Sequence, residues 1–245
     1  MRVPLERAEE ARARFVELAP AGFEEATAGD ELELAAYVEA AGEAGIRAAF
    51  PDATSAAVPP GWEDAWRRFH RPVRVGRLWV GPPWEEPEPG AVAVVVDPGR
   101  AFGTGAHPTT RLCLELLLAV ERGSLLDLGC GSGVLAIAAA RLGFAPVAAL
   151  DDDEAAVAAA EENARVNGVV VSVARADVLA DALPAADVAV ANIALAVVEA
   201  LGPRVDAAVL LASGYLARDR PAPRGWQAVD RRELDGWAAD RFERA

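Results

Sequence analysis

The chain has 245 residues, of which 53% are hydrophobic, so it can form one large domain or one domain with a smaller companion. Its net charge of −14 argues against broad nucleic-acid binding, which needs a basic surface, and suits a basic partner. No apolar run approaches the ~18 residues of a membrane span, and no signal-peptide core follows the first residue. Two cysteines and two histidines are too few for a disulfide framework or a zinc site. We therefore expect a cytoplasmic protein with no membrane partner and no metal.

Residues 1–58 are predicted to form a small domain of two helices and four strands. These elements are expected at Arg2–Leu5 (strand), Glu6–Leu18 (helix), Gly22–Ala28 and Glu31–Val38 (strands), Glu39–Phe50 (helix) and Ala53–Val58 (strand). Apolar residues at helical spacing mark the first helix, and Gly29-Asp30 is typical of a hairpin turn. The order β-α-β-β-α-β predicts a ferredoxin-like α+β fold.

Residues 59–90 are rich in proline and glycine and are predicted to be a linker. We expect a short helix at Trp62–Phe69 and a strand at Arg77–Val80 within it. Four tryptophans in this range are expected to pack between domains rather than to bind a ligand. They are Trp62, Trp66, Trp79 and Trp84.

From residue 91 to residue 245, predicted strands and helices alternate. The strands are expected at Ala91–Val96, Leu125–Leu128, Val147–Leu150, Val169–Val173, Val188–Ala191, Ala207–Ala212, Gln227–Arg231 and Gly236–Phe242. The helices are expected at Thr109–Val120, Gly133–Leu142, Asp153–Val166 and Leu195–Pro203. Continuous apolar strands that alternate with helices indicate a doubly wound α/β fold, in which helices cover both faces of a parallel sheet.

The most informative stretch is the glycine-rich turn that follows the strand at 125–128. Glycines at 129, 131 and 133 let the backbone turn tightly and let a ligand approach where a Cβ would collide. The helix beyond them offers free N–H groups at its N-terminus. Because ligands of open α/β sheets bind at the carboxyl ends of the strands, this turn predicts a nucleotide-like ligand.

Three carboxylates suggest which ligand binds there. Asp151 ends the next strand and can accept hydrogen bonds from both ribose hydroxyls, while Asp177, after the third strand, can accept from the adenine amine. A dinucleotide would place its pyrophosphate beside Asp127, and the glycine register fits only if it is forced. S-adenosylmethionine has no phosphate, and its sulfonium and ammonium groups would be attracted by Asp127. Electrostatics thus favours S-adenosylmethionine over a dinucleotide, and a turn with no ligand is the remaining alternative.

Two further segments carry polar groups toward this site. The loop at 101–110 contains glycines, threonines and His107, so it can close over a ligand, and Thr109 is a good helix N-cap. His107 is either a base or a hydrogen-bonding residue. Asn192 follows the strand at 188–191, where its amide oxygen can accept a hydrogen bond from an amine nucleophile. The alternative for Asn192 is that it caps the next helix.

The motif at 126–133 resembles the first motif of class I S-adenosylmethionine-dependent methyltransferases, and Asp151 matches the acidic residue that ends their second strand. More specific segments resemble the bacterial ribosomal protein L11 methyltransferase family, PrmA, with a similarity that is clear over 60–245. These segments are 101–110, Val190–Ile193, Asn163–Gly168, Ala212–Tyr215 and Trp62–Arg67. Asp152 and the stretch at 204–207 depart from the family pattern.

The resemblance implies a seven-stranded Rossmann-like methyltransferase sheet in 91–245, with residues 1–58 as a substrate-recognition domain. It implies S-adenosylmethionine as cofactor and places cofactor contacts on Thr110, Gly129, Asp151 and Asn192. With the residues singled out above, the predicted cofactor site comprises Phe102, Thr104, Gly105, Thr110, Asp127, Gly129, Gly131, Asp151, Asp177 and Asn192, and Asn192 is also the predicted catalytic residue.

The implied reaction is in-line methyl transfer to lysine side-chain or N-terminal amines of ribosomal protein L11, free or on the ribosome, with no direct nucleic-acid requirement. Two alternatives stay open. One is a methyltransferase for another protein, a small amine or a glutamine amide, although the last usually carries Asn-Pro-Pro-Tyr where Ile193-Ala194 follows Asn192 here. The other is a protein that binds S-adenosylmethionine without turnover.

Overall fold

The computed structural model describes residues 1–4, 7, 8, 11, 14, 15, 18, 19, 24–28, 31–36, 38, 40–56, 70–97 and 105–245. The chain divides into two compact units, Met1–Trp62 and Glu63–Ala245. Within the described ranges, no helix combines the length and the apolar character needed to cross a membrane. The predicted helix at Trp62–Phe69 lies outside these ranges, and the predicted boundaries at 58 and 90 remain predictions.

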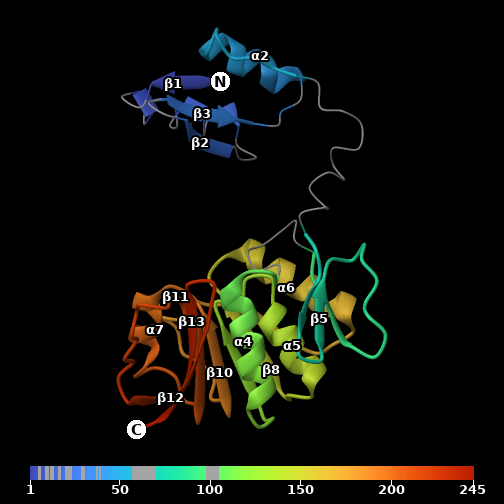
Figure 1. The fold of residues 1–245 in the computed structure, drawn as a ribbon, viewed down its shortest axis with the longest axis vertical. Helices are drawn as coiled ribbons and strands as arrows, with labels where there is room; N and C mark the ends of the chain where they lie inside the picture. The colour runs from blue at the N-terminus through green and yellow to red at the C-terminus, as the bar shows by residue number, and fades with distance from the viewer. Residues whose placement is uncertain are drawn as a thin grey trace. The chain divides into compact units, whose positions relative to one another are not determined.

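The described part of the first unit contains three antiparallel strands and one helix (Figure 1). They are β1 (Arg2–Pro4), β2 (Glu24–Ala28), β3 (Glu31–Ala35) and α2 (Ala40–Ala49), with the strands in the order β1-β3-β2. Leu32 and Leu34 of the central strand are fully buried and pack with Phe15, whose ring lies 5.7 Å from that of Phe50. Phe15 is one of the residues that helical spacing predicted on the inner face of the segment at 6–18.

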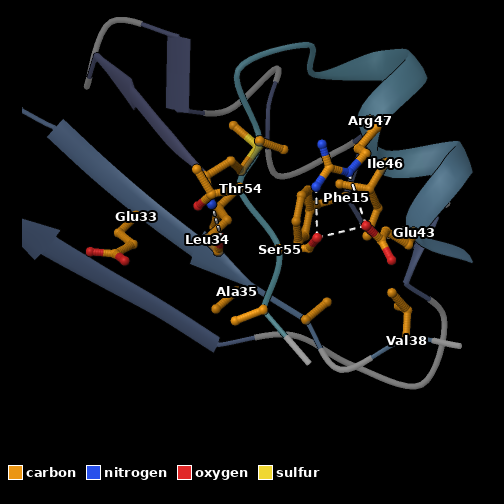
Figure 2. Close-up of a pocket in the computed structure, with 14 residues that line it drawn as sticks. Phe15, Glu33, Leu34, Ala35, Val38, Glu43, Ile46, Arg47, Thr54 and Ser55 are labelled. Atoms are coloured by element: carbon orange, nitrogen blue, oxygen red, sulfur yellow. Dashed lines mark hydrogen bonds and ion pairs between the residues drawn. The ribbon is translucent and has the colours of Figure 1, made fainter. Parts of the chain in front are cut away.

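The predicted strand at Ala53–Val58 is wrong over residues 53–56, and residues 57 and 58 lie outside the described ranges. Side chains of α2 hold this segment instead of a neighbouring strand (Figure 2). Arg47 Nη2 donates to Ser55 Oγ at 2.7 Å, and Ser55 Oγ donates to Glu43 Oε1 at 2.6 Å. These groups border a cavity of about 270 Å³ between the segment, α2 and β3.

The second unit contains the large sheet and its helices. Its strands are β4 (Val73–Val75), β5 (Leu78–Gly81), β6 (Val92–Val95), β7 (Leu125–Leu128), β8 (Val147–Asp151), β9 (Ser172–Arg175), β10 (Val188–Asn192), β11 (Val209–Leu216), β12 (Trp226–Leu234) and β13 (Trp237–Arg244). The helices among its described residues are α4 (Pro108–Ala119), α5 (Val134–Leu142), α6 (Glu154–Asn167) and α7 (Leu195–Leu201).

Seven strands form one sheet in the order β12-β13-β11-β10-β7-β8-β9, in which β13 is the antiparallel partner of β11 and of β12 and the other pairs are parallel. Residues of α4, α5 and α6 pack in the core on one face, and residues of α7 pack in the core on the other (Figure 1). The predicted doubly wound, seven-stranded Rossmann-like sheet is therefore confirmed.

Two strands, β6 and β9, differ from the sequence prediction as follows. The strand predicted at Ala91–Val96 is present as β6, but it pairs with β5 in a separate three-stranded sheet. Asn167 of α6 bonds both backbone groups of Val95, at 2.8 and 2.6 Å, so these groups are not available to the large sheet. The strand predicted at Val169–Val173 begins three residues later, because Gly168 ends α6 with a φ of +62° and the chain turns back there.

A buried polar network joins the C-terminal hairpin to β11. The Tyr215 hydroxyl lies 2.8 Å from Ala212 O and 2.9 Å from Asp240 Oδ2, and Arg231 Nη1 donates to the same carboxylate oxygen at 2.8 Å. Tyr215 and Asp240 are buried. The hydroxyl therefore fixes β13 against β11, at the antiparallel end of the sheet.

We expect Tyr215→Phe to lower the free energy of unfolding by about 2 kcal/mol, because a buried carboxylate loses a hydrogen-bond donor while the ring packing stays. Denaturant unfolding measures this change. Val229→Thr, on exposed β12 surface, is the matched control and should change stability by less than about 0.5 kcal/mol. Equal stability of Tyr215→Phe and the unsubstituted protein would contradict a structural role for this network.

Candidate active site

The glycine-rich turn, residues 129–133, is anchored to the carboxyl end of β8. Gly129 N and Cys130 N both donate to Leu150 O, at 2.8 and 3.0 Å. Gly131 N donates to Asp151 Oδ2 at 2.8 Å. The main chain and the last carboxylate of one strand therefore set the conformation of the turn that follows its neighbour β7.

Left-handed backbone angles explain why glycines occupy this turn. Gly129, Gly131 and Gly133 have φ values of +73°, +53° and +78°, a region that residues with a Cβ rarely adopt. A Cβ on Gly129 would lie 2.5 Å from Ile193 Cγ2, and one on Gly133 would lie 2.9 Å from Ala160 Cβ. The sequence analysis predicted that a ligand would occupy this space, whereas protein atoms fill it at these two positions.

Asp127 is the residue before the last of β7, near the carboxyl end of the strand, and is 1% exposed. Its Oδ2 accepts a hydrogen bond from Ala136 N, in the first turn of α5, at 3.0 Å. Within the described part of the chain, its Oδ1 has no hydrogen-bond partner. Burial, with a smaller contribution from the charge of Asp151, raises the pKa of Asp127 to about 7, although the Ala136 N–H opposes this shift. The orphaned oxygen makes this site suited to a cationic or hydrogen-bond-donating group.

The other two predicted carboxylates lie at the ends of the next two strands: Asp151 is the last residue of β8, and Asp177 follows the end of β9 by two residues. Asp151 accepts from Gly131 N through Oδ2 and from Asp153 N through Oδ1, so its carboxylate orientation is fixed. Each of its oxygens can accept a second hydrogen bond. Asp177 is exposed and accepts from Leu179 N at 2.8 Å through Oδ1. Because β7, β8 and β9 are parallel neighbours, these carboxylates and Asp127 lie along one edge of the sheet.

Asn192 is the last residue of β10, and its side chain contacts α4. Its Nδ2 donates to Thr110 Oγ1 at 3.3 Å, which fixes the amide and leaves Oδ1 able to accept from a ligand. Close packing supports the same strand end, since a Cβ on Gly214 would lie 2.0 Å from Ile193 O. Thr110 is buried, whereas Asn192 is partly exposed.

The loop before α4 is described only from Gly105. Gly105 has a φ of +85°, and a Cβ on it would lie 2.4 Å from Val80 Cγ1. The predicted cofactor residues Phe102 and Thr104 lie outside the described residues. His107, rather than Thr109, is the N-cap of α4: its Nδ1 accepts from Thr109 N at 3.4 Å and contacts Thr109 Oγ1 at 2.8 Å.

The N-cap prediction failed because proline at 108 is well suited to the first helical turn, so the cap falls one position before it. The His107 ring also packs against Trp237, with a centroid distance of 4.9 Å and an edge-on geometry. The structure thus places His107 in a capping hydrogen bond and a ring contact, and both alternatives for its role stay predictions.

Sequence reasoning gave no role to Asn163 of α6, although it lies in a segment that carried the family resemblance. Its Nδ2 donates to Ser132 O, within the glycine-rich turn, at 2.9 Å. The signal that could have found it is its spacing: Asn163 and Asn167 are four residues apart and so share one helix face.

The matching family is described as ribosomal protein L11 methyltransferase (PrmA) and covers residues 23–219. Proteins named ribosomal protein L11 methyltransferase from Symbiobacterium thermophilum and Azotobacter vinelandii are 43% and 44% identical to the chain. The matches cover 73% and 72% of this chain, and 64% and 65% of the relatives. The chain thus spans slightly less than two thirds of the length of these curated relatives.

A crystal structure of a ribosomal protein L11 methylase from Lactobacillus delbrueckii subsp. bulgaricus aligns with a TM-score of 0.64 at 30% identity, covering 71% of this chain and 99% of that chain.

The raised pKa of Asp127 predicts a pH-dependent stability. Between about pH 4 and pH 7 the folded protein keeps a proton that the unfolded chain has released, so unfolding becomes more favourable as the pH rises. We expect the unsubstituted protein to lose about 2 kcal/mol of unfolding free energy between pH 5 and pH 7 that Asp127→Asn does not lose.

Denaturant unfolding of both proteins at the two pH values measures this difference, and contributions from other groups cancel in the comparison. Parallel pH profiles for the two proteins would contradict a protonated Asp127.

Proposed function

The chain belongs to the ribosomal protein L11 methyltransferase (PrmA) family, and on this premise we propose that it transfers methyl groups from S-adenosylmethionine to amines of ribosomal protein L11. The acceptors are lysine side chains, the N-terminal amine, or both. The observation that carries the proposal is that three groups lie at the same edge of the sheet. The glycine-rich turn follows β7, Asp151 ends β8 and Asn192 ends β10, and β7 lies between the other two strands.

The residues of this edge fit S-adenosylmethionine better than a phosphate-bearing cofactor. Asp127 has an orphaned oxygen in a buried position, where a nearby cation is favourable and a pyrophosphate is repelled. Asp151 is held in a fixed orientation by two backbone N–H groups and can accept from ribose hydroxyls. Asp177 Oδ2, at the end of the next strand along the edge, completes the set that would hold the adenosine.

The proposed mechanism relies on positioning. The bound cofactor supplies an electrophilic methyl group on its sulfonium. Asn192 Oδ1 accepts a hydrogen bond from the neutral amine and so directs the nitrogen lone pair, while Thr110 prevents the amide from rotating. Only about one free lysine in 2,500 is neutral at pH 7, so partial desolvation at the site has to lower the pKa of the acceptor amine. Water takes the released proton.

We assign substrate recognition to the N-terminal unit. It carries acidic side chains, and Glu33 and Glu43 line its cavity (Figure 2). Arg2 and Arg47 pair with these two carboxylates, so it is the net charge of −14 that is complementary to a basic ribosomal protein. We place the reaction in the cytoplasm, on L11 either free or in the ribosome, with no direct contact to nucleic acid required.

Mass spectrometry of purified L11 after incubation with the protein and S-adenosylmethionine tests the proposal. We expect mass increments of about 14 Da per methyl group, which is the elementary mass of an added CH₂, and their absence when the cofactor is omitted. Methylation of a small amine but of no ribosomal protein would overturn the substrate assignment. If the protein binds S-adenosylmethionine but transfers no methyl group, the proposed activity is wrong and the alternative of a non-catalytic binding protein holds.

We expect Asn192→Ala to lower kcat about a hundredfold, because the amine is no longer aimed at the methyl group. The Kd for S-adenosylmethionine should stay within about threefold of the unsubstituted value, since other residues hold the adenosine. Thr110→Val, which removes only the hydroxyl that orients the Asn192 amide, should cause a smaller loss of kcat. Steady-state kinetics and calorimetry provide both quantities. An unchanged kcat for Asn192→Ala would remove this residue from the mechanism.

A further inference from the structure

We propose that Asn163 is a positioning residue for the methyl-transfer site, because one buried amide holds both the last peptide of the glycine-rich turn and the backbone at Asp97. The inference rests on the proposed function, since it concerns the affinity of the same site for S-adenosylmethionine. Among the described residues, Asn163 makes no hydrogen bond to a predicted cofactor residue or to Asn192, so we infer that it acts through the backbone that it holds.

Helix α6 lies directly against the glycine-rich turn. A Cβ on Gly133 would come within 2.9 Å of Ala160 Cβ, so the two backbones approach as closely as a glycine allows. Asn163 follows Ala160 by three residues on the same helix face and is 4% exposed. From this position Asn163 Nδ2 donates to Ser132 O at 2.9 Å.

This hydrogen bond fixes one side of the peptide between Ser132 and Gly133. The other side is fixed as well, because Gly133 N donates to Cys130 O at 2.9 Å. Since the carbonyl and the N–H of a planar trans peptide point in opposite directions, two such bonds define the orientation of its plane. Asn163 therefore helps to set the left-handed conformation of Gly133, where the turn becomes α5.

The same amide reaches a second segment. Asp97 N donates to Asn163 Oδ1 at 3.2 Å. Asp97 follows β6 and directly precedes in sequence the range 98–104, which carries the predicted cofactor residues Phe102 and Thr104. One side chain, with one donor and one acceptor, thus links the turn to the chain segment that leads into the loop at 101–110.

Asn167 provides a matched comparison within the same helix. It is 3% exposed, and its amide bonds Val95 N at 2.8 Å, Val95 O at 2.6 Å and Asn163 O at 2.8 Å. It therefore has burial like that of Asn163, and its amide makes three hydrogen bonds where that of Asn163 makes two, but these bonds go to β6 and to α6 itself and not to the turn. A residue that matters only for stability should behave like Asn167.

The test compares Asn163→Ala with Asn167→Ala in the full chain. Calorimetry gives the Kd for S-adenosylmethionine, steady-state methylation of L11 gives KM and kcat, and thermal unfolding gives stability, all at a temperature well below both unfolding midpoints. For Asn163→Ala we expect Kd and the KM for S-adenosylmethionine to rise at least about tenfold, with kcat within about threefold, because the buried Ser132 O and the Asp97 N–H lose the hydrogen bonds that Asn163 makes with them. For Asn167→Ala we expect a comparable loss of thermal stability and a Kd within about twofold.

If Asn163→Ala does not fold, Asn163→Asp replaces it in the same comparison. It keeps the acceptor for Asp97 N and removes the donor to Ser132 O, so it should also weaken S-adenosylmethionine binding at least about tenfold. Equal Kd values for the unsubstituted protein and the Asn163 variants, or an equal rise in Kd for Asn167→Ala, would overturn the inference alone. Absence of S-adenosylmethionine binding by the unsubstituted protein would overturn the proposed function with it.

Discussion

The site depends on the hydrogen bonds that the end of β8 accepts from the glycine-rich turn. Leu150 O receives Gly129 N and Cys130 N, and the Asp151 carboxylate receives Gly131 N. Backbone N–H groups of a left-handed turn cannot pair within a helix or a sheet, so the neighbouring strand has to satisfy them. The same interactions orient the Asp151 carboxylate, which is proposed to bind the ribose. The conformation of the turn and the orientation of Asp151 therefore depend on each other.

The parallel sheet places Asn192 beside the turn and Asp151. β7 lies between β8 and β10, so the turn, Asp151 and Asn192 emerge at the same edge although they are distant in sequence. Packing keeps them there, since Gly214 leaves no space for a side chain beside Ile193 O. The buried charge of Asp127 is costly in an apolar core, and a cationic ligand nearby would lower that cost. Stability and ligand binding therefore place opposite demands on one carboxyl group.

Much of this arrangement was predictable from spacing. Apolar runs and glycines located β7, β8 and β10, and the polar residues near the carboxyl ends of these strands, Asp127, Asp151 and Asn192, indicated the ligand edge. The errors arose where side chains from distant elements decide local structure. Asn167 bonds the backbone of β6, which pairs with β5 and not with the large sheet, and Ser55 bonds to α2 instead of extending a strand. Sequence periodicity contains no signal for such long-range contacts. The presence of protein atoms beside Gly129, where a ligand was expected, likewise depends on how β10 packs.

Calorimetric titration of S-adenosylmethionine into the unsubstituted protein and Asp151→Asn tests the central claim most directly. The account predicts saturable binding at one site, with a Kd that rises at least about tenfold in Asp151→Asn because an ionised acceptor of the ribose hydroxyls is lost. Circular dichroism of the variant should show the unsubstituted fold. A Kd that Asp151→Asn leaves unchanged, or no binding by either protein, would contradict it.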